Sequence, residues 1–281
     1  MGLTSGRREV VVGLLDGPVA VDHPELAHNS IRELPGRGGG RCVQATSPAC
    51  RHGTFVAGIL AARRGGAAPA ICPDCSLLVR SIFAETITDG QQPPSATAQQ
   101  LAAAIGECVD AGARVLNLSV GMSEPSTRDE RELDDALEYA ARQGAVVVAA
   151  AGNQATLGSS AITRHPWVVP VVGYGMDGRP TAHSNLGSSM GKRGLGAPGE
   201  NVTSLDPRGE PLTQAGTSFA APFVTGAIAL LWSLFPGATA AEVKSAVLGG
   251  HRQRTSVTPP LLDAWSAYQT LSAQQPARVM G

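Results

Sequence analysis

The sequence predicts an α/β fold in which a mostly parallel, twisted central sheet is covered by helices on both faces. Two observations predict it. Short apolar runs of strand length alternate along the chain with longer segments of helical periodicity. The short runs are rich in Val, Leu and Ala without a polar side, as expected for strands that are buried on both faces. Such an alternation is typical of a parallel sheet with helical crossovers.

The first part of the chain contains strand-like runs and two amphipathic helices. The strands are expected at residues 10–15, 77–82, 115–118, 146–150 and 168–172. Residues 97–110 read as a helix whose buried face carries Leu101, Ile105 and Val109. Residues 130–142 read as a second helix, with a capping box of Thr127 and Glu130 and a buried face of Leu133, Leu137 and Ala140.

The C-terminal part contains a different kind of helix. Residues 217–232 are apolar nearly all round, which predicts a buried central helix. Residues 239–247 form a shorter amphipathic helix packed beyond it, and residues 272–281 read as a polar, loose tail. The sequence therefore predicts one domain over residues 1–270 and a polar C-terminal tail over residues 271–281.

Composition excludes several partner classes. The chain has 281 residues, with 22 basic and 23 acidic side chains and a net charge of −1. A neutral balance offers no electrostatic recruitment to nucleic acid or to an anionic membrane. No apolar run approaches the roughly 20 residues of a membrane-spanning helix. We expect neither nucleic acid nor membrane as a partner, and the oligomeric state stays open.

The most informative motif begins at Gly216-Thr217-Ser218, where a tight turn enters the apolar helix. The N-terminus of a helix offers unpaired N–H groups and a partial positive charge. These features stabilise the anion that forms when a serine alkoxide attacks a carbonyl group. Ser218 is therefore a candidate nucleophile, and the alternative is an ordinary helix start.

Two further residues are candidate partners of Ser218. Asp16 ends the apolar run 10–15 and is followed by Gly17, so it should lie at the carboxyl edge of the sheet. His52 stands near the start of a helix of small residues. A single loop acid is usually a cap and a single histidine is usually structural, but the three residues together favour catalysis.

These motifs identify the chain, from about residue 10 to residue 248, as resembling the subtilisin-like serine proteases. The order Asp, His, Ser matches that family and differs from the chymotrypsin order. The resemblance implies the family's three-layer fold. It also implies that Asp16 orients and stabilises the imidazole, that His52 is general base and then general acid, and that Ser218 is the nucleophile.

The resemblance also implies an oxyanion donor. The run 146–150 leads into Gly152 and Asn153, whose side-chain amide matches the family's donor and would act with the backbone N–H of Ser218. The alternative role for Asn153 is that of a turn-forming asparagine after a strand.

Substrate-binding segments follow from the same comparison. The family pairs an extended peptide, as an added β-strand, with the segment that matches Ser119, Val120 and Gly121. The opposite wall of the primary specificity pocket would be formed by Ala150, Ala151 and Gly152. The floor should fall within residues 158–164, which align loosely, so the preferred side chain stays open. Arg164 would either attract an acidic side chain or lie in solvent, and solvent is favoured.

Within the family, several short sequence segments resemble those of the proteases that mature cyanobactin-type ribosomal peptides. They are Asp16-Gly17-Pro18-Val19 with His23-Pro24, and the stretch 81–85. Members of that branch either cut a leader peptide from a precursor or join the core peptide into a ring. Ring-forming members carry a helical insertion near the site, whereas residues 29–50 here are Gly- and Pro-rich without helical periodicity.

The predicted function is therefore a serine endopeptidase that hydrolyses peptide bonds through an acyl-enzyme, with a leader peptide as its suggested substrate. The alternatives are a macrocyclase or transamidase that uses the same acyl-enzyme, and a general degradative subtilase. A peptide-binding pseudoenzyme would require a damaged triad or oxyanion hole, and the motifs show neither.

Two residues depart from the usual subtilisin pattern. Phe55 replaces a second histidine near His52, and Phe219 replaces the methionine that commonly follows the nucleophile. Both changes keep bulk, so altered packing is expected. Loss of the methionine should also remove its sensitivity to oxidation.

No cofactor or catalytic metal is expected. Glu25 matches a carboxylate ligand of structural calcium in relatives, but the loop 63–69 offers no matching oxygen-rich side chains. Asp22 and Glu25 are therefore interpreted as solvated loop acids, and the alternative is a structural calcium site that includes Glu25. Zinc at Cys72 and Cys75 is not favoured because no second pair or histidine cluster accompanies them.

Five cysteines leave at least one unpaired. Cys42 and Cys50 would close a loop beside His52, Cys72 and Cys75 would pair or remain thiols, and Cys108 reads as a core residue. Asp16 lies so close to Met1 that this sequence has no room for a secretion signal or a pro-segment. We therefore expect a cytoplasmic enzyme. The alternative is a secreted enzyme whose upstream segments were removed. A reducing cytoplasm would keep all five cysteines reduced and an exported enzyme would form one or two bridges, so the disulfide state stays open.

Overall fold

The structure is a computed structural model that describes residues 2–36, 40–83, 85, 96–119, 130–249 and 255–274. Its centre is a seven-stranded sheet in the order β2-β3-β1-β4-β5-β6-β7, in which every neighbouring pair is parallel. The strands are β1 (Val11–Asp16), β2 (Ile31–Glu33), β3 (Ser76–Ser81), β4 (Val115–Leu118), β5 (Val146–Ala150), β6 (Val168–Tyr174) and β7 (Leu195–Pro198). The predicted α/β fold with a mostly parallel sheet is confirmed.

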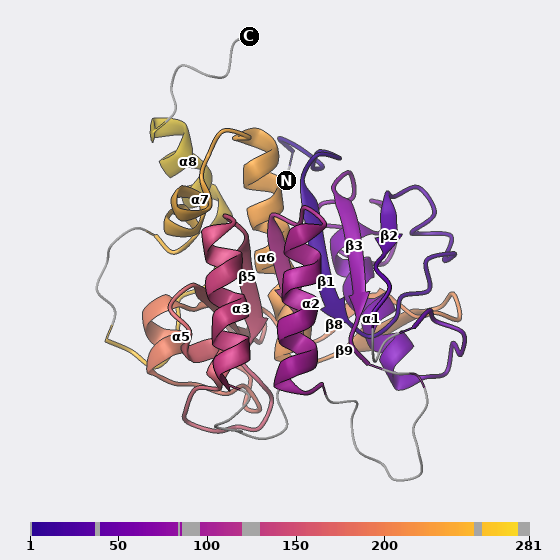
Figure 1. The fold of residues 1–281 in the computed structure, drawn as a ribbon, viewed down its shortest axis with the longest axis horizontal. Coiled ribbons are helices and arrows are strands. Elements are labelled where there is room, and N and C mark those ends of the chain that lie inside the picture. Colours follow the sequence, from indigo (N-terminus) through magenta and orange to yellow (C-terminus); the bar gives the residue numbers. More distant parts are fainter. Residues whose placement is uncertain are drawn as a thin grey trace.

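Helices cover both faces of this sheet, so the molecule has three layers (Figure 1). One layer contains α2 (Ala98–Asp110), α3 (Glu130–Arg142) and the short α4 (Ala161–Arg164). The other contains α1 (Pro48–Ala61), α6 (Thr217–Leu234), α7 (Ala240–Val247) and α8 (Ala264–Gln274). Along β5, Val147 and Ala149 pack into the first layer, while Val146 and Val148 pack into the second. Burial on both faces explains why the strands are continuously apolar.

The helix α6 is the central element of the second layer. It contacts β4, β5, β6 and β7 as well as α1 and α7. By length and composition it is the one helix in the described ranges that would suit a membrane span, but 83% of it is buried inside the protein. It is therefore the buried core helix that the sequence predicts.

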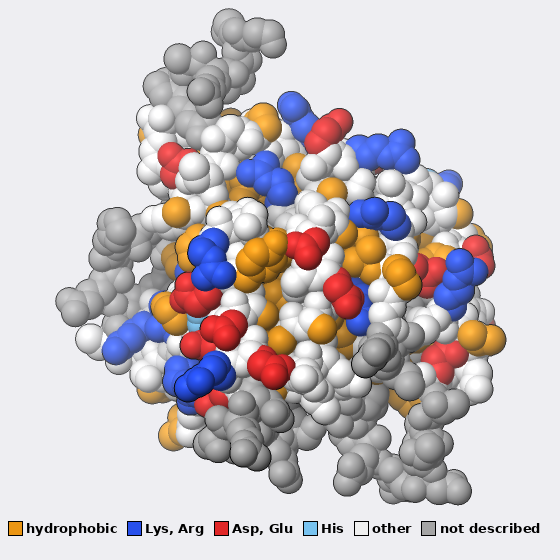
Figure 2. Space-filling model, in the orientation of Figure 1, with side chains coloured by type: hydrophobic (Ala, Val, Ile, Leu, Met, Phe, Trp, Pro, Cys, Tyr) orange, Lys and Arg blue, Asp and Glu red, His pale blue; other side chains and the backbone are white. Residues whose placement is uncertain are grey.

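The face formed by α2 and α3 carries the predicted amphipathic pattern. All six predicted core residues of these helices are buried: Leu101, Ile105, Val109, Leu133, Leu137 and Ala140. On the solvent side, basic and acidic side chains are interspersed over this face (Figure 2). This mixed surface agrees with the net charge of −1 for the whole chain.

Some elements were not predicted. An antiparallel hairpin of β8 (Val202–Leu205) and β9 (Pro211–Gln214) lies outside the main sheet and packs against α1. The sequence did not indicate this hairpin, the strands β2 and β7, or the helix α5 (Ser188–Arg193). Each of these elements is six residues or shorter, which is too short to show a clear period.

The C-terminal boundary also differs from the prediction. The helix α8 continues to Gln274, and its Leu271 is fully buried. The predicted start of a loose tail at residues 271–272 is therefore wrong for the residues up to Gln274. The remaining part of that tail, and the predicted cap Thr127, lie outside the described residues.

Candidate active site

Several predicted site residues lie at one edge of the sheet, where the carboxyl ends of the parallel strands meet. In the strand register, the residue before Asp16 lies beside Leu118 of β4, and Leu118 lies beside Ala149 of β5. Asp16, Ser119 and Ala150 therefore form a row across three neighbouring strands. Open α/β sheets bind their ligands outside this edge.

Asp16 and His52 are in direct contact. Nδ1 of His52 lies 2.6 Å from Oδ1 of Asp16, whose side chain is fully buried. The same oxygen accepts a 2.6 Å hydrogen bond from the backbone N–H of Gly17. Because Oδ1 is the acceptor, Nδ1 carries the imidazole proton and Nε2 has a free lone pair.

The charge of Asp16 also changes the basicity of His52. Burial lowers the pKa of His52, but the negative charge of Asp16 and its hydrogen bond outweigh burial, so the net pKa lies above the ordinary value. An imidazole of raised pKa is a stronger base at the pH where it is still neutral.

Two glycines allow the start of α1 to approach the end of β1. A Cβ atom on Gly17 would lie 2.0 Å from the carbonyl oxygen of Ala49, and one on Gly53 would lie 2.3 Å from the carbonyl oxygen of Gly17. Neither position has room for a side chain. The glycines that follow Asp16 and His52 therefore bring the imidazole within reach of the carboxylate.

Ser218 lies in the first turn of α6 and is 8% exposed. Pro222, four residues later, has no N–H to donate to the Ser218 carbonyl oxygen. The hydroxyl of Ser119 donates a 2.9 Å hydrogen bond to that oxygen instead. Ser119 Oγ accepts in turn from Asn117 Nδ2 at 2.6 Å, and the Thr225 hydroxyl donates to Asn117 Oδ1 at 2.8 Å. This buried network fixes the first turn of α6 to the end of β4.

The imidazole of His52 lies beside the turn that carries Ser218. The centroid of its ring lies 5.2 Å from the ring centroid of Phe219, the residue that follows Ser218. The ring centroids of Phe219 and Phe55 lie 4.5 Å apart, so the two residues that depart from the subtilisin pattern pack against each other. Among the described residues, no hydrogen bond joins Ser218 Oγ to His52. In enzymes without substrate this bond is often long and tightens when substrate binds.

The side-chain amide of Asn153 is oriented by Thr217. Asn153 Oδ1 accepts hydrogen bonds from the Thr217 N–H at 2.9 Å and from its hydroxyl at 3.0 Å. The Thr217 hydroxyl also accepts from the Gly152 N–H at 3.1 Å. Because Oδ1 is occupied, Nδ2 is left as the donor, and it lies near Gly216 at the entrance of α6. Sequence reasoning missed this role of Thr217, although Gly-Thr-Ser was the signal.

The predicted substrate-binding segments lie at neighbouring strand ends. Ser119 follows β4, and Ala150 is the last residue of β5, the adjacent strand, with Ala151 and Gly152 directly after it. Val120 and Gly121 lie outside the described residues. Arg164 is exposed at the end of α4 and pairs with Glu130 of α3 at 3.0 Å. This position agrees with the solvent-exposed role that the sequence favours.

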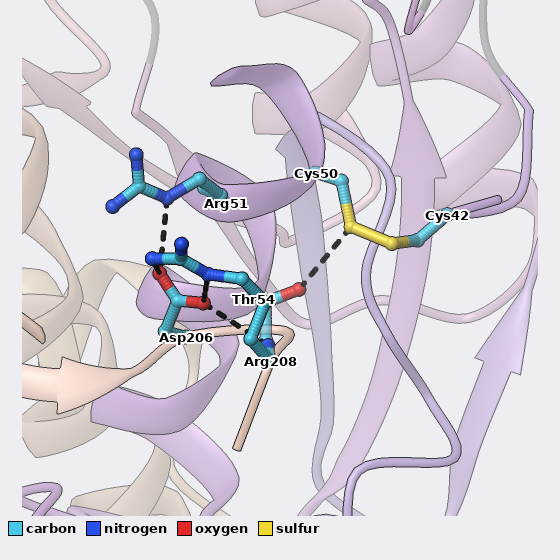
Figure 3. A network of polar contacts seen from close by, with 6 residues as sticks. All are labelled: Cys42, Cys50, Arg51, Thr54, Asp206 and Arg208. Carbon is cyan, nitrogen blue, oxygen red and sulfur yellow. Dashed lines mark hydrogen bonds and ion pairs between the residues drawn. A yellow bond between two sulfur atoms is a disulfide. The ribbon is translucent and has the colours of Figure 1, made fainter. Parts of the chain in front are cut away.

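An ionic cluster holds the start of α1 against the β8–β9 hairpin (Figure 3). Arg51, the neighbour of His52, donates from Nε to Oδ2 of Asp206 at 2.9 Å. Arg208 donates to both oxygens of the same carboxylate, at 2.8 and 3.1 Å. Hydrogen bonds from Arg208, aided by Arg51 and opposed by burial, lower the pKa of Asp206 to about 2. The sequence did not reveal this cluster because Arg51 lies 155 residues from Asp206 in the chain.

A disulfide joins Cys42 to Cys50, two residues before His52 (Figure 3). It is one of the pairings that the sequence left open. Cys72, Cys75 and Cys108 are free and buried. Burial raises the pKa of Cys108 to about 12, as expected for a core residue.

Potential metal ligands gather at one place in the described ranges of the chain. This group consists of Cys42, Cys50 and Glu85, and its two sulfurs are joined in the disulfide. Both carboxylate oxygens of Glu85 accept from the N–H groups of Val43 and Gln44. Glu85 therefore pins the loop that leads into α1. Glu25, the candidate calcium ligand, is not part of this group.

Comparison with known proteins defines the class. The model of the subtilase family, peptidase S8, matches residues 7–258. The chain belongs to the subtilase family.

Relatives with curated descriptions include a mycosin and a serine protease. Mycosin-3 of Mycobacterium tuberculosis is 32% identical over 246 residues, which cover 68% of this chain and 52% of mycosin-3. The major intracellular serine protease of Bacillus subtilis is 30% identical over 234 residues, which cover 80% of this chain and 69% of that protease. This chain thus spans about half the length of mycosin-3.

Solved structures give similarity over nearly the whole chain. A mutant of the protease domain of PatA matches with a TM-score of 0.87 and 28% identity, covering 99% of this chain and 100% of that domain. The prenylagaramide maturation protease PagA matches with a TM-score of 0.82 and 27% identity, covering 96% of each chain. The PatG macrocyclase in complex with peptide, at a TM-score of 0.81 and 19% identity, shares the fold. The expected resemblance to subtilisin-like serine proteases, and to the peptide-maturation branch among them, is confirmed.

Proposed function

We propose that this chain is a serine endopeptidase in which Ser218 is the nucleophile, His52 the general base and Asp16 the residue that orients the imidazole. The observation that carries the proposal is the 2.6 Å contact of His52 with the buried Asp16, on an imidazole that lies beside the first turn of α6. This contact leaves Nε2 free to take a proton from Ser218. Membership of the subtilase family supports the same roles.

The reaction proceeds in two halves. Ser218 Oγ attacks the substrate carbonyl while Nε2 of His52 takes its proton, and Asp16 stabilises the imidazolium. The C–N bond then breaks, the imidazolium gives its proton to the departing amine, and an ester to Ser218 remains. Water, deprotonated by His52, attacks this ester. Ser218 leaves with the proton from His52, and the acid product is released.

The oxyanion is stabilised by two donors. Asn153 Nδ2 is free to donate because Thr217 occupies Oδ1. The backbone N–H of Ser218 belongs to the first turn of α6, where N–H groups have no partner within the helix. The positive end of the helix dipole adds to both donors. These groups act on charge that develops only after the attack, so they raise kcat more than they change substrate affinity.

The peptide substrate binds as an extended strand between residues 119–121 and residues 150–152. These two segments follow β4 and β5, which are adjacent in the sheet. A peptide strand would pair with the backbone of residues 119–121, while its side chains enter the pocket walled by the small residues Ala150, Ala151 and Gly152. The backbone N–H groups of Ala151 and Gly152 are already bonded, to the Val171 carbonyl oxygen and to the Thr217 hydroxyl.

The substrate class we propose is a ribosomal peptide precursor from which a leader is cut. PatA and PagA, which resemble this chain over nearly its whole length, are named as maturation proteases of patellamide and prenylagaramide. A macrocyclase or transamidase would use the same acyl-enzyme with an amine as acceptor. Hydrolysis is favoured because the described residues between Ser30 and Ser47 form the strand β2 and turns, and no helix that would shield the ester from water.

The test is product analysis on a peptide library by mass spectrometry. Linear fragments that have gained one water support the endopeptidase, whereas ring products without that water support the macrocyclase. A fluorophosphonate probe should label the wild-type protein at Ser218 and should not label Ser218→Ala. A folded wild-type protein that is neither labelled nor able to cut any peptide would refute the proposal in favour of a peptide-binding pseudoenzyme.

A further inference from the structure

We propose that Asn185 is a positioning residue that holds the loop of Asn153 in its active conformation. The proposal rests on the proposed endopeptidase function. Asn185 belongs to the segment between β6 and α5, and neither its position in the sequence nor any predicted motif connects it with the site. Its side chain nevertheless forms more hydrogen bonds to the oxyanion loop, residues 151–156, than any other side chain in the described part of the molecule.

The Asn185 amide uses all its hydrogen-bonding capacity on this loop. Oδ1 accepts from the N–H of Gln154 at 2.9 Å and from the N–H of Thr156 at 3.1 Å. Nδ2 donates to the carbonyl oxygen of Ala151 at 3.2 Å and to Oε1 of Gln154 at 2.7 Å. These contacts bind the backbone on both sides of Asn153.

The conformation of the oxyanion loop needs this support. Gly152 has a φ of +104°, and Ala155 has a φ of +53°, which is unfavourable for a residue with a Cβ atom. Such a backbone persists only where the surroundings hold it. A Cβ atom on Gly152 would lie 2.3 Å from Asn185 Nδ2, so the loop wraps closely around the amide. The contact with Asn185 thus requires glycine at the position before Asn153.

Asn185 is itself fixed to the central sheet. Its backbone N–H donates to the carbonyl oxygen of Gly152 at 2.9 Å. The preceding residue, Ser184, is buried, and its hydroxyl bonds both the N–H and the carbonyl of Gly173 in β6, at 3.2 and 3.3 Å. Thr181 Oγ1 lies 2.8 Å from the same Ser184 hydroxyl. The position of Asn185 is therefore set by β6.

Two side chains from outside the oxyanion loop thus act on Asn153 in different ways. Thr217 orients the amide itself, whereas Asn185 holds the backbone that carries it. Within the described ranges, no third side chain from outside the loop hydrogen-bonds to residues 151–156. Without Asn185, the donor Nδ2 would remain present but would lose its fixed position relative to Ser218.

The expected consequence is a loss of kcat through Asn153. Removal of an oxyanion donor of this type lowers turnover by about 10²–10³-fold, a magnitude measured on a subtilisin, and a misplacement of about 1 Å can cost about 10²-fold. Asn185→Ala should therefore lower kcat by roughly 10- to 100-fold, with a smaller change in KM, because the donor acts in the transition state.

A double-mutant cycle separates this positioning role from a general structural one. It measures kcat and KM of the wild type, Asn153→Ala, Asn185→Ala and the double variant, on a fluorogenic peptide that the wild type cuts, below the Tm of every variant. If Asn185 acts through Asn153, adding Asn185→Ala to Asn153→Ala should lower kcat further by less than about threefold. An equal loss in both backgrounds, or no loss in the folded single variant, would overturn the proposal.

Two further variants complete the test. Asn185→Asp keeps both acceptor bonds and loses both donor bonds, so it replaces the alanine variant in the cycle should that variant not fold. Asn29→Ala removes a structural asparagine that donates to the carbonyl oxygens of Ala61 and Pro73, and it should lower the Tm without lowering kcat. A wild type that cuts no peptide would refute the proposed function, whereas an active wild type with an unimpaired, folded Asn185→Ala would refute this inference alone.

Discussion

The two helix layers of the molecule differ in how much of each helix they bury. In α3 three of 13 residues are buried, whereas in α6 15 of 18 are. The proposed catalytic side chains His52 and Ser218 lie on the second layer, near the starts of α1 and α6. A helix that is packed on all sides has little freedom to shift, so the side chains at its start keep their positions. The helices α2 and α3 close the core without contributing a candidate site residue.

The difference between the layers predicts that equal chemical changes have unequal effects. Asp16→Asn keeps the shape of the side chain and removes its charge next to His52. The loss in kcat should be about 10⁴-fold, the size found for this change in other Ser-His-Asp triads, because the imidazole is no longer held in the right tautomer.

The same variant should shift the pH profile of kcat/KM. In the wild type the pKa of His52 is raised, so activity should rise with pH through an acid limb that lies above the ordinary pKa of histidine. In Asp16→Asn burial still lowers the pKa and the opposing charge is gone, so the acid limb should move to lower pH. Asp134→Asn is the matched control, because this exposed carboxylate lies 3.8 Å from His165 in the other layer. An unchanged acid limb in Asp16→Asn would contradict the assignment of His52 as the base.

A pair of variants compares stability with activity in the two layers. Leu137→Ala removes a fully buried side chain of α3 and should lower the free energy of unfolding by about 2–5 kcal/mol, with kcat of the folded protein unchanged. Ser119→Ala leaves the Ser218 carbonyl oxygen and Asn117 Nδ2 without a bond and should cost about 1–3 kcal/mol.

Ser119→Ala should also lower kcat, because the first turn of α6 loses the hydrogen bond that joins it to the end of β4. Urea unfolding and steady-state kinetics on the same samples measure both quantities. A loss of kcat in Leu137→Ala as large as in Ser119→Ala would show that the two layers do not differ in this way.

The sequence was sufficient to predict the elements with a long or continuous pattern. The helix at residues 130–142 and the strands at residues 115–118 and 146–150 have the predicted bounds, because their buried positions follow a clear period or an unbroken apolar run. The end of the chain was predicted less well. The spacing of Ala264, Ala267 and Leu271 was a helical signal, but the surrounding polar residues obscured it.

Candidate site residues could be proposed from the sequence where the family pattern assigns a residue type to a known step, as with Asp16, His52, Ser218 and Asn153. The residues that hold these groups in place could not be proposed in this way. Asn185 contacts Gln154, which lies 31 residues away in the sequence. Asp206 contacts Arg51, which lies 155 residues away. Such contacts depend on the completed fold and leave no local pattern, so a single sequence does not reveal them.

The disulfide beside His52 should contribute to stability rather than chemistry. Replacing Cys42 and Cys50 by alanine should lower the free energy of unfolding by roughly 2–3 kcal/mol, because the short loop that the bond closes gains freedom in the unfolded chain. Alkylation in denaturant should modify three cysteines before reduction and five after it. Five modified cysteines without reductant would show that the bond does not form.

The smallest effect is expected where the two departures from the subtilisin pattern meet. Phe219→Met replaces a ring that lies 4.5 Å from Phe55, and losing this aromatic pair should cost about 0.5–1.5 kcal/mol. The variant should also become sensitive to hydrogen peroxide, because a sulfoxide next to Ser218 would disturb the first turn of α6. Met176, which is 91% exposed, should be oxidised in the wild type and the variant alike and serves as an internal control. Mass spectrometry measures the oxidation of each methionine in the peroxide-treated proteins, and an activity assay on the same samples measures how much activity remains. If the wild type were inactivated as fast as the variant, the oxidation-sensitive group would lie elsewhere than position 219.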